Sequence, residues 1–181
     1  MAKLITNPQI KKAIKDCERD ECVEIILEIA QSCHQAREFL TLKFTENHSA
    51  ILEDYKKKVR YEFYPPHGGF GRLQLKNAKK AINDFKKICP NKVMVIELML
   101  FYVECCIEFT NDYGDIDERF YCSAESVFDQ VAKAINTSDI SVFEMFSVRL
   151  RTCVDKTRHI GWGFHDCLKE TYYEIKWVKK L

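Results

Sequence analysis

The stretch VMVIELMLFYVECCIEFTNDY, from Val93 to Tyr113, decides the fold. Fourteen of the seventeen positions from Val93 to Phe109 are apolar, which predicts a helix that is buried on nearly all sides. The exceptions are Glu97, Glu104 and Glu108. At 100° per residue these three carboxylates share one narrow face. We therefore expect a core helix with a thin acidic edge.

Helical spacing of apolar residues, broken by proline, glycine and polar turns, divides the rest of the chain. Further helices are expected to begin at Asn7-Pro8, Asp20, His48, Gln74, Glu118 or Ser123, Ser138 or Asp139, and after Gly163, with a break near His34 and the last helix reaching the end of the chain. Pro65 to Leu73 is expected to be a loop. No stretch shows sustained alternation with period two. We predict an all-α fold of about eight antiparallel helices, a helical-hairpin array or bundle in a single domain over residues 1–181.

Composition and charge limit the classes of function. The 181 residues carry a formal net charge of +1, so the whole protein exerts no general attraction on nucleic acid. The nine cysteines form no CxxC pair, and the first residues show no apolar signal segment; we interpret the cysteines as reduced thiols of a cytoplasmic protein. The one candidate membrane span, Val93 to Phe109, is shorter than the ~20 residues that a bilayer needs and carries three glutamates, so no membrane partner is expected.

Four stretches resemble a known family. They are the two-helix N-terminal lead, FYPPHGGFGRLQLKNAKKAINDFKK from Phe63, IELMLFYVECCIEFTNDYGDIDERFYCSAESVF from Ile96, and IGWGFHD from Ile160. Together they resemble a family of bacterial helical proteins catalogued as a domain of unknown function. Its hallmarks are an AKKAI-DFKK helix, an FT-YGDID turn and a GWGFHD segment near the C-terminus. The resemblance covers nearly the whole chain and implies a cytosolic helical fold, without implying an activity.

A weaker likeness is to tetratricopeptide-type helical hairpins. Tyr113-Gly114-Asp115, followed by Phe128, is similar to the turn and second helix of such a unit. Only one such unit is visible and no 34-residue period repeats. The likeness supports hairpins stacked side by side, without a true repeat array.

The favoured function is a non-catalytic module that binds another macromolecule, with a protein as the preferred partner. The proposed surface combines the GDID turn at Gly114 to Asp117, the loop Pro65 to Leu73 and the GWGFHD segment, because aromatic residues gather in these turns rather than in helix centres. Phe70 and Phe120 belong to this aromatic group. The candidate binding residues here are Tyr113, Asp117, Tyr121, Trp162, Phe164 and Asp166.

A small metal-dependent enzyme is the first alternative. Glu104 and Glu108 share a helix face, and Asp115 with His165 would complete a set of ligands for a divalent cation. The competing interpretation is structural: acids on a buried helix commonly form a solvated edge or ion pairs with lysine or arginine. The ExxH signature of di-iron bundles is absent, and no other cofactor is expected.

The second alternative is phosphate or nucleic-acid binding by the face from Lys76 to Lys87. Arg72 in the glycine-rich loop and Lys76, Lys79 and Lys80 on the following helix are the candidate residues. No GxxxxGK pattern is present, which excludes a nucleotide-binding P-loop. A lysine face is most often only solvated, so nucleic acid is not the favoured partner.

Overall fold

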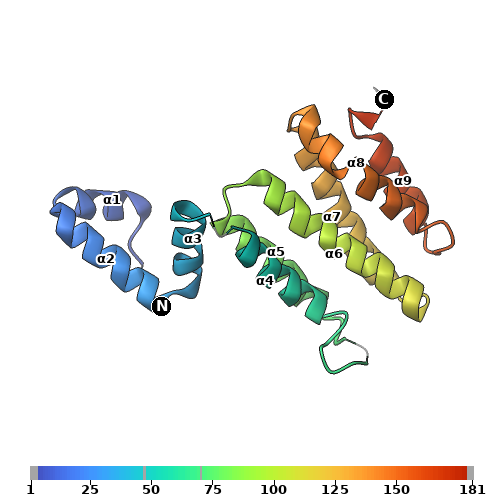
Figure 1. The fold of residues 1–181 in the computed structure, drawn as a ribbon, viewed down its shortest axis with the longest axis horizontal. Coiled ribbons are helices and arrows are strands. Elements are labelled where there is room, and N and C mark those ends of the chain that lie inside the picture. Colours follow the sequence, from blue (N-terminus) through green and yellow to red (C-terminus); the bar gives the residue numbers. More distant parts are fainter. Residues whose placement is uncertain (1–3, 47, 70, 179–181) are drawn as a thin grey trace. The chain divides into compact units, whose positions relative to one another are not determined.

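The computed structural model describes residues 4–46, 48–69 and 71–178. These residues form nine helices and no strand, which confirms the all-α prediction (Figure 1). The chain divides into two compact units, Met1–Glu46 and Asn47–Leu181. The single domain over residues 1–181 stays a prediction.

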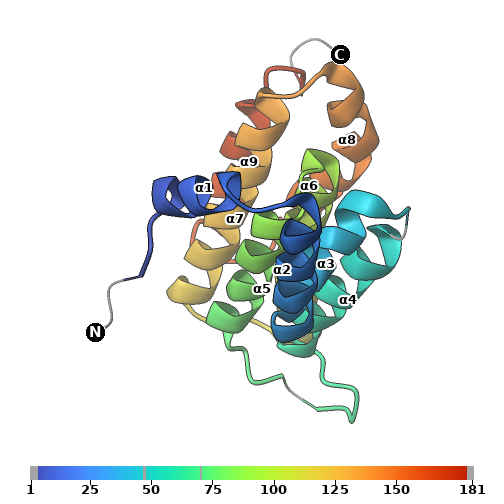
Figure 2. The same cartoon turned by 90° about the vertical axis from the view of Figure 1, so that its left-hand side faces the viewer.

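The N-terminal unit consists of α1 (Asn7–Lys15), α2 (Arg19–Ser32) and α3 (His34–Phe44). Figure 2 shows α1 running in a different direction from α2. Cys33 adopts an extended conformation between α2 and α3, which confirms the break expected near His34. Leu42 is the one buried residue among the described residues of this unit. The unit therefore has almost no core of its own.

The C-terminal unit holds the core. Its helices are α4 (His48–Tyr61), α5 (Leu75–Ile88), α6 (Lys92–Tyr113), α7 (Glu118–Asn136), α8 (Ile140–Asp155) and α9 (Phe164–Tyr173). Helix α6 contacts α4, α5, α7 and α8, and in Figure 1 α4 and α5 lie on one side of it and α7 and α8 on the other. Helix α9 packs on α7 and α8. The apolar stretch around Val103 is thus enclosed by its neighbours, as the sequence predicts.

An asparagine cap and a glycine fix the two ends of α6. The Asn91 side chain accepts a hydrogen bond from the Val93 amide at 2.9 Å, and this cap satisfies one of the free amides of the first turn. The helix ends at Gly114, whose φ of 89° is a conformation that glycine adopts without strain. Asp117 then caps α7 by accepting from the Phe120 amide at 2.8 Å. None of the described helices is long and apolar enough to cross a bilayer.

The last helix ends earlier than the sequence predicts. We expected it to reach the end of the chain, but α9 stops at Tyr173. The Asn136 side chain donates to the Glu174 carbonyl at 3.2 Å and accepts from the Lys176 amide at 2.8 Å. These two bonds hold the chain in turns, and Ile175 is buried there. A residue at the end of α7 thus ends the helical geometry.

Candidate functional site

The acidic edge of α6 faces guanidinium and ammonium groups from the neighbouring helices. Arg149 of α8 donates from Nε and NH2 to the two carboxylate oxygens of Glu104, each at 2.8 Å, and from NH1 to Glu97. Lys56 of α4 lies 2.8 Å from the second oxygen of Glu97. Burial acts to raise the pKa of Glu97, but these two cations outweigh it and lower that pKa.

Glu108 completes the edge in the same way. Arg60 of α4 donates from NH1 and NH2 to its two oxygens at 3.1 and 3.0 Å. The Arg60 guanidinium also lies over the Tyr64 ring, 4.8 Å from its centroid. Each of the three glutamates of this edge therefore has a cationic partner, so the edge is a set of ion pairs between helices.

The four candidate metal ligands are not gathered in one place. Glu104 and Glu108 line a hollow of about 260 Å³ together with Arg149 and Lys156. His165 lines a different cleft, between α8 and α9, and its Nδ1 lies 3.1 Å from Thr157 Oγ1. Among the described residues, no three His, Cys, Asp or Glu side chains form a group that could hold a metal ion.

Asp115, the remaining member of that set, ties two turns together. Its Oδ1 accepts from the Tyr121 hydroxyl at 2.5 Å, and its Oδ2 accepts from Trp162 Nε1 at 2.8 Å. Asp117 caps α7. The GDID turn and the GWGFHD segment are therefore brought together, as the predicted surface requires, but both aspartates have structural roles there.

Burial separates the predicted aromatic residues into two groups. Phe120, Tyr121 and Phe164 are at most 3% exposed, so core packing accounts for them. Tyr113 and Trp162 are 42% and 58% exposed and remain available at the surface. Asp166 lies exposed in the first turn of α9, and Phe70 lies outside the described residues.

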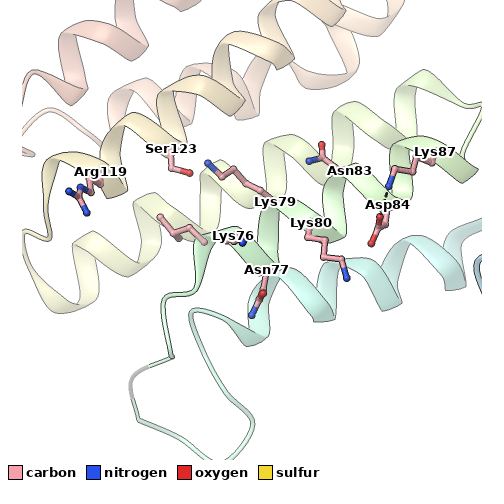
Figure 3. A pocket seen from close by; sticks show the side chains of 10 residues that line it. Lys76, Asn77, Lys79, Lys80, Asn83, Asp84, Lys87, Arg119 and Ser123 are labelled. Atoms are coloured by element: carbon pink, nitrogen blue, oxygen red, sulfur yellow. Dashed lines mark hydrogen bonds and ion pairs between the residues drawn. The ribbon is translucent and has the colours of Figure 1, made fainter. Parts of the chain in front are cut away.

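A groove between α5 and α7, here called the lysine groove, gathers basic side chains (Figure 3). It measures about 640 Å³ and is lined by Leu75, Lys76, Asn77, Lys79, Lys80, Asn83, Asp84, Lys87, Arg119 and Ser123. Helix α5 buries one apolar stripe, which includes Ala78, Ile82 and Phe85, and this leaves its lysines on the opposite face. The structure thus brings Lys76, Lys79 and Lys80 to one groove, whereas Arg72 is not among its lining residues.

The charges of the lysine groove are largely uncompensated. Lys87 pairs with Asp84 at 3.0 Å, while Lys76, Lys79, Lys80 and Arg119 form no ion pair within the described part of the chain. Figure 3 shows the Lys79 amine directed toward Ser123 of α7, whereas Lys80 and Asn77 point away from α7.

The groove wall on α7 was not predicted from the sequence. Arg119 and Ser123 lie one helical turn apart on α7, more than thirty residues from the α5 lysines. The Ser123 hydroxyl is hydrogen-bonded to the buried Tyr102 hydroxyl at 2.8 Å. Beyond Ser123, Lys86 of α5 donates to Gln130 of α7 at 2.8 Å. No local signal in the sequence links these residues, because only the packing of both helices on α6 brings them together.

The N-terminal unit leaves an apolar surface uncovered. Neither α1 nor α2 contains a buried residue. Of the eighteen large hydrophobic residues that are exposed in the described part of the chain, eleven belong to residues 4–44. The α1–α2 apolar surface, as we call it, consists of Ile10, Ile14, Val23, Ile25, Ile26, Leu27 and Ile29, which are 37–49% exposed. The sequence signal was the width of the apolar arc on α2, about 200° at 100° per residue, which is more than one neighbouring helix covers.

Comparison with known proteins finds one family whose sequence model covers nearly all of the chain. No curated protein and no solved structure matches it. The sequence model of DUF6155, a family of unknown function, matches residues 5–175. The match includes helices of both units and confirms the resemblance to a helical family of unknown function. The chain therefore belongs to DUF6155, a family of unknown function.

Proposed function

We propose that the protein is a non-catalytic helical module that binds another protein chain through the α1–α2 apolar surface. The observation that carries this proposal is the exposure of this surface. Burying one valine, isoleucine or leucine side chain contributes about 1.5–3 kcal/mol, so seven such residues left more than a third exposed represent a large unused driving force. Large apolar side chains exposed together in this way mark interaction sites.

The charges beside this surface indicate the chemistry of the partner. On α1, Ile10 and Ile14 line a shallow hollow of about 400 Å³ together with Lys11 and Lys15. An apolar hollow bordered by lysines fits a partner helix whose apolar face is bordered by carboxylates. On α2, the apolar residues are bordered by acids that include Glu24 and Glu28.

The chain therefore carries both halves of a complementary pair, and a second copy is the partner that we propose. The α1 helix of one copy would cover α2 of the other and the reverse, which gives a two-fold symmetric interface. The two helices of one chain do not cover each other's apolar faces, because Ile14 of α1 is 45% exposed and Leu27 of α2 is 48% exposed. Three residues, Asp16 to Glu18, connect the two helices.

A charge swap tests this proposal. One variant, Lys11→Glu/Lys15→Glu, makes both helices acidic, and a second, Glu24→Lys/Glu28→Lys, makes both basic. Each alone opposes like charges across the interface, so sedimentation equilibrium should show the dimer dissociation constant rising by about tenfold or more. An equimolar mixture should restore association, because each α1 then meets an α2 of opposite charge.

Variants that replace apolar side chains test whether apolar contact, in addition to charge, contributes to dimer formation. Ile14→Ser/Ile26→Ser should abolish dimers, whereas the control Met145→Ser/Val148→Ser removes two side chains of α8 that are 65% and 76% exposed and should leave association unchanged. A monomeric wild-type protein would contradict the second-copy partner. Charge variants that lose stability without any rescue on mixing would indicate pairing within one chain instead.

The proposed location is the cytoplasm. All nine cysteines are free, including Cys33 and Cys122 at the surface. Unpaired surface thiols persist most readily where the surroundings are reducing. Fractionation of cells that produce the tagged chain would test this location.

A further inference from the structure

The lysine groove lies in the C-terminal unit and has no part in the function proposed above. Five of its lining residues are cationic and one, Asp84, is acidic. The difference, five minus one, gives the groove a net charge of +4 in a protein whose total is +1. The groove is therefore a local anion-attracting site on an otherwise balanced surface.

The spacing of the cations indicates an elongated ligand. Lys76 and Lys87 are eleven positions apart on α5, which corresponds to about 16 Å along the helix axis at 1.5 Å per residue. Lys79 lies between them, and Arg119, at the start of α7, lines the same groove (Figure 3). A single small anion would contact only part of this row. The volume of about 640 Å³ is that of an ordinary ligand site.

The side chains that line the groove recognise charge and not bases. None of the described lining residues is aromatic, whereas single-stranded nucleic acid is normally bound with bases stacked on aromatic rings. Arg119 supplies a planar guanidinium that can bind a phosphate through two N–H groups. Lysines supply compact charges that contact phosphate oxygens without reading a sequence.

We propose that the lysine groove binds a linear chain of linked phosphate groups, through Lys76, Lys79 and Lys87 on one wall and Arg119 on the other. Such a chain is free inorganic oligophosphate or the triphosphate part of a nucleotide. Asn83 lies between Lys79 and Lys87 and offers an amide donor to the same ligand.

The cleft between α8 and α9 is the weaker anion site. It is lined by Arg151, Arg158, Lys169 and His165. Asp155 lies 2.5 Å from Arg158 NH2 and 3.8 Å from Arg151 Nε. One carboxylate therefore neutralises much of the charge of both arginines, which does not happen to Lys76, Lys79 or Arg119 in the lysine groove.

Titration calorimetry on the full chain tests the proposal, with sodium tripolyphosphate, orthophosphate and ATP as probes. Tripolyphosphate should bind, and orthophosphate should bind at least about tenfold more weakly because it reaches fewer cations. Affinity should fall steeply as salt rises. ATP as tight as tripolyphosphate would assign the ligand to nucleotides, and ATP that is clearly weaker would assign it to free oligophosphate; both outcomes support the phosphate-chain site.

Matched variants locate the binding. Lys76→Gln/Lys79→Gln/Arg119→Gln should weaken tripolyphosphate binding by about tenfold or more and flatten its salt dependence. The control Lys57→Gln/Lys92→Gln/Lys133→Gln removes three charges of the same unit outside the groove and should bind as the wild type does. Lys79→Arg keeps the positive charge and should retain binding, which shows that the charge at this position, and not the lysine side chain as such, holds the ligand.

Three results would overturn the proposal. The first is absence of tripolyphosphate binding at low salt. The second is an equal loss of affinity in the groove variant and its control, which would mean that only the overall charge matters. The third is an RNA oligonucleotide that binds more tightly than oligophosphate with the same number of phosphates, which would make the groove a nucleic-acid site.

Discussion

The guanidinium of Arg149 on α8 holds both carboxylate oxygens of Glu104 on α6, with Nε and NH2 each 2.8 Å from an oxygen. Its third nitrogen reaches Glu97. One arginine thus neutralises two acids on a helix that is otherwise enclosed by apolar side chains. This contact also joins α8 to the centre of the bundle.

Replacing Arg149 by methionine should lower the free energy of unfolding by about 2 kcal/mol. The pair is partly buried, so we expect a cost between that of an exposed ion pair, below about 1 kcal/mol, and that of a broken buried pair, about 3–5 kcal/mol. Urea denaturation followed by circular dichroism would measure the change. Lys57→Met is the control, since it removes an ion pair whose side chains are 77% and 63% exposed, and it should cost less than about 0.5 kcal/mol.

Glu97 should make stability depend on pH. Its pKa is lowered in the folded protein because Arg149 and Lys56 outweigh the effect of burial. A carboxyl whose folded pKa lies below the unfolded value, about 4.3, stabilises the fold above that pH and loses its contribution as pH falls through the folded pKa. Glu97→Gln should therefore have a lower free energy of unfolding than the wild type at pH 7. This difference between the two proteins should become smaller below about pH 4. A gap that stays constant from pH 7 to pH 3 would contradict this assignment.

Much of the fold follows from local sequence signals. The apolar stretch around Val103 predicts an enclosed helix, and the glutamates at helical spacing predict its acidic edge. The sequence does not identify Arg149 as the partner of Glu104, because the two are 45 residues apart and many exposed cations were available. Pairing of this kind depends on the packing of α8 on α6, which no local pattern encodes.

The candidate sites were less predictable. The lysines of α5 were expected on one face and lie there, but Arg119 joins them only through the fold. Tyr121 and Phe164 were expected at the surface, because they stand next to glycine-containing turns. The turns fold back against the bundle, and both rings are buried and lie with their centroids 4.9 Å apart. Sequence position at a turn therefore did not determine exposure.

Gly71 should not tolerate even alanine. The loop after α4 returns along its own start, with the Gly71 amide 3.0 Å from the Phe63 carbonyl oxygen and the Leu73 amide 3.0 Å from that of Glu62. A Cβ at Gly71 would lie 2.0 Å from the Glu62 oxygen, and the backbone would have to move.

We expect Gly71→Ala to lower the free energy of unfolding by about 2 kcal/mol or more. Gly161→Ala is the matched control, because its Cβ would meet nothing closer than Asp115 Oδ2 at 3.6 Å, and it should stay within about 0.5 kcal/mol of wild type. Equal stabilities of the two variants in urea denaturation would contradict the close approach.

The nine free thiols should react in an order set by burial. Burial raises the pKa of Cys105 and of Cys153 to about 12, and both side chains are enclosed, so neither forms an accessible thiolate near pH 8. Cys33 and Cys122 are exposed and should react first with an aromatic disulfide reagent. Cys33→Ser/Cys122→Ser should remove the fast phase, and 6 M guanidinium should release all nine thiols. Rapid labelling of Cys153 in the native protein would show that α8 opens readily from the core.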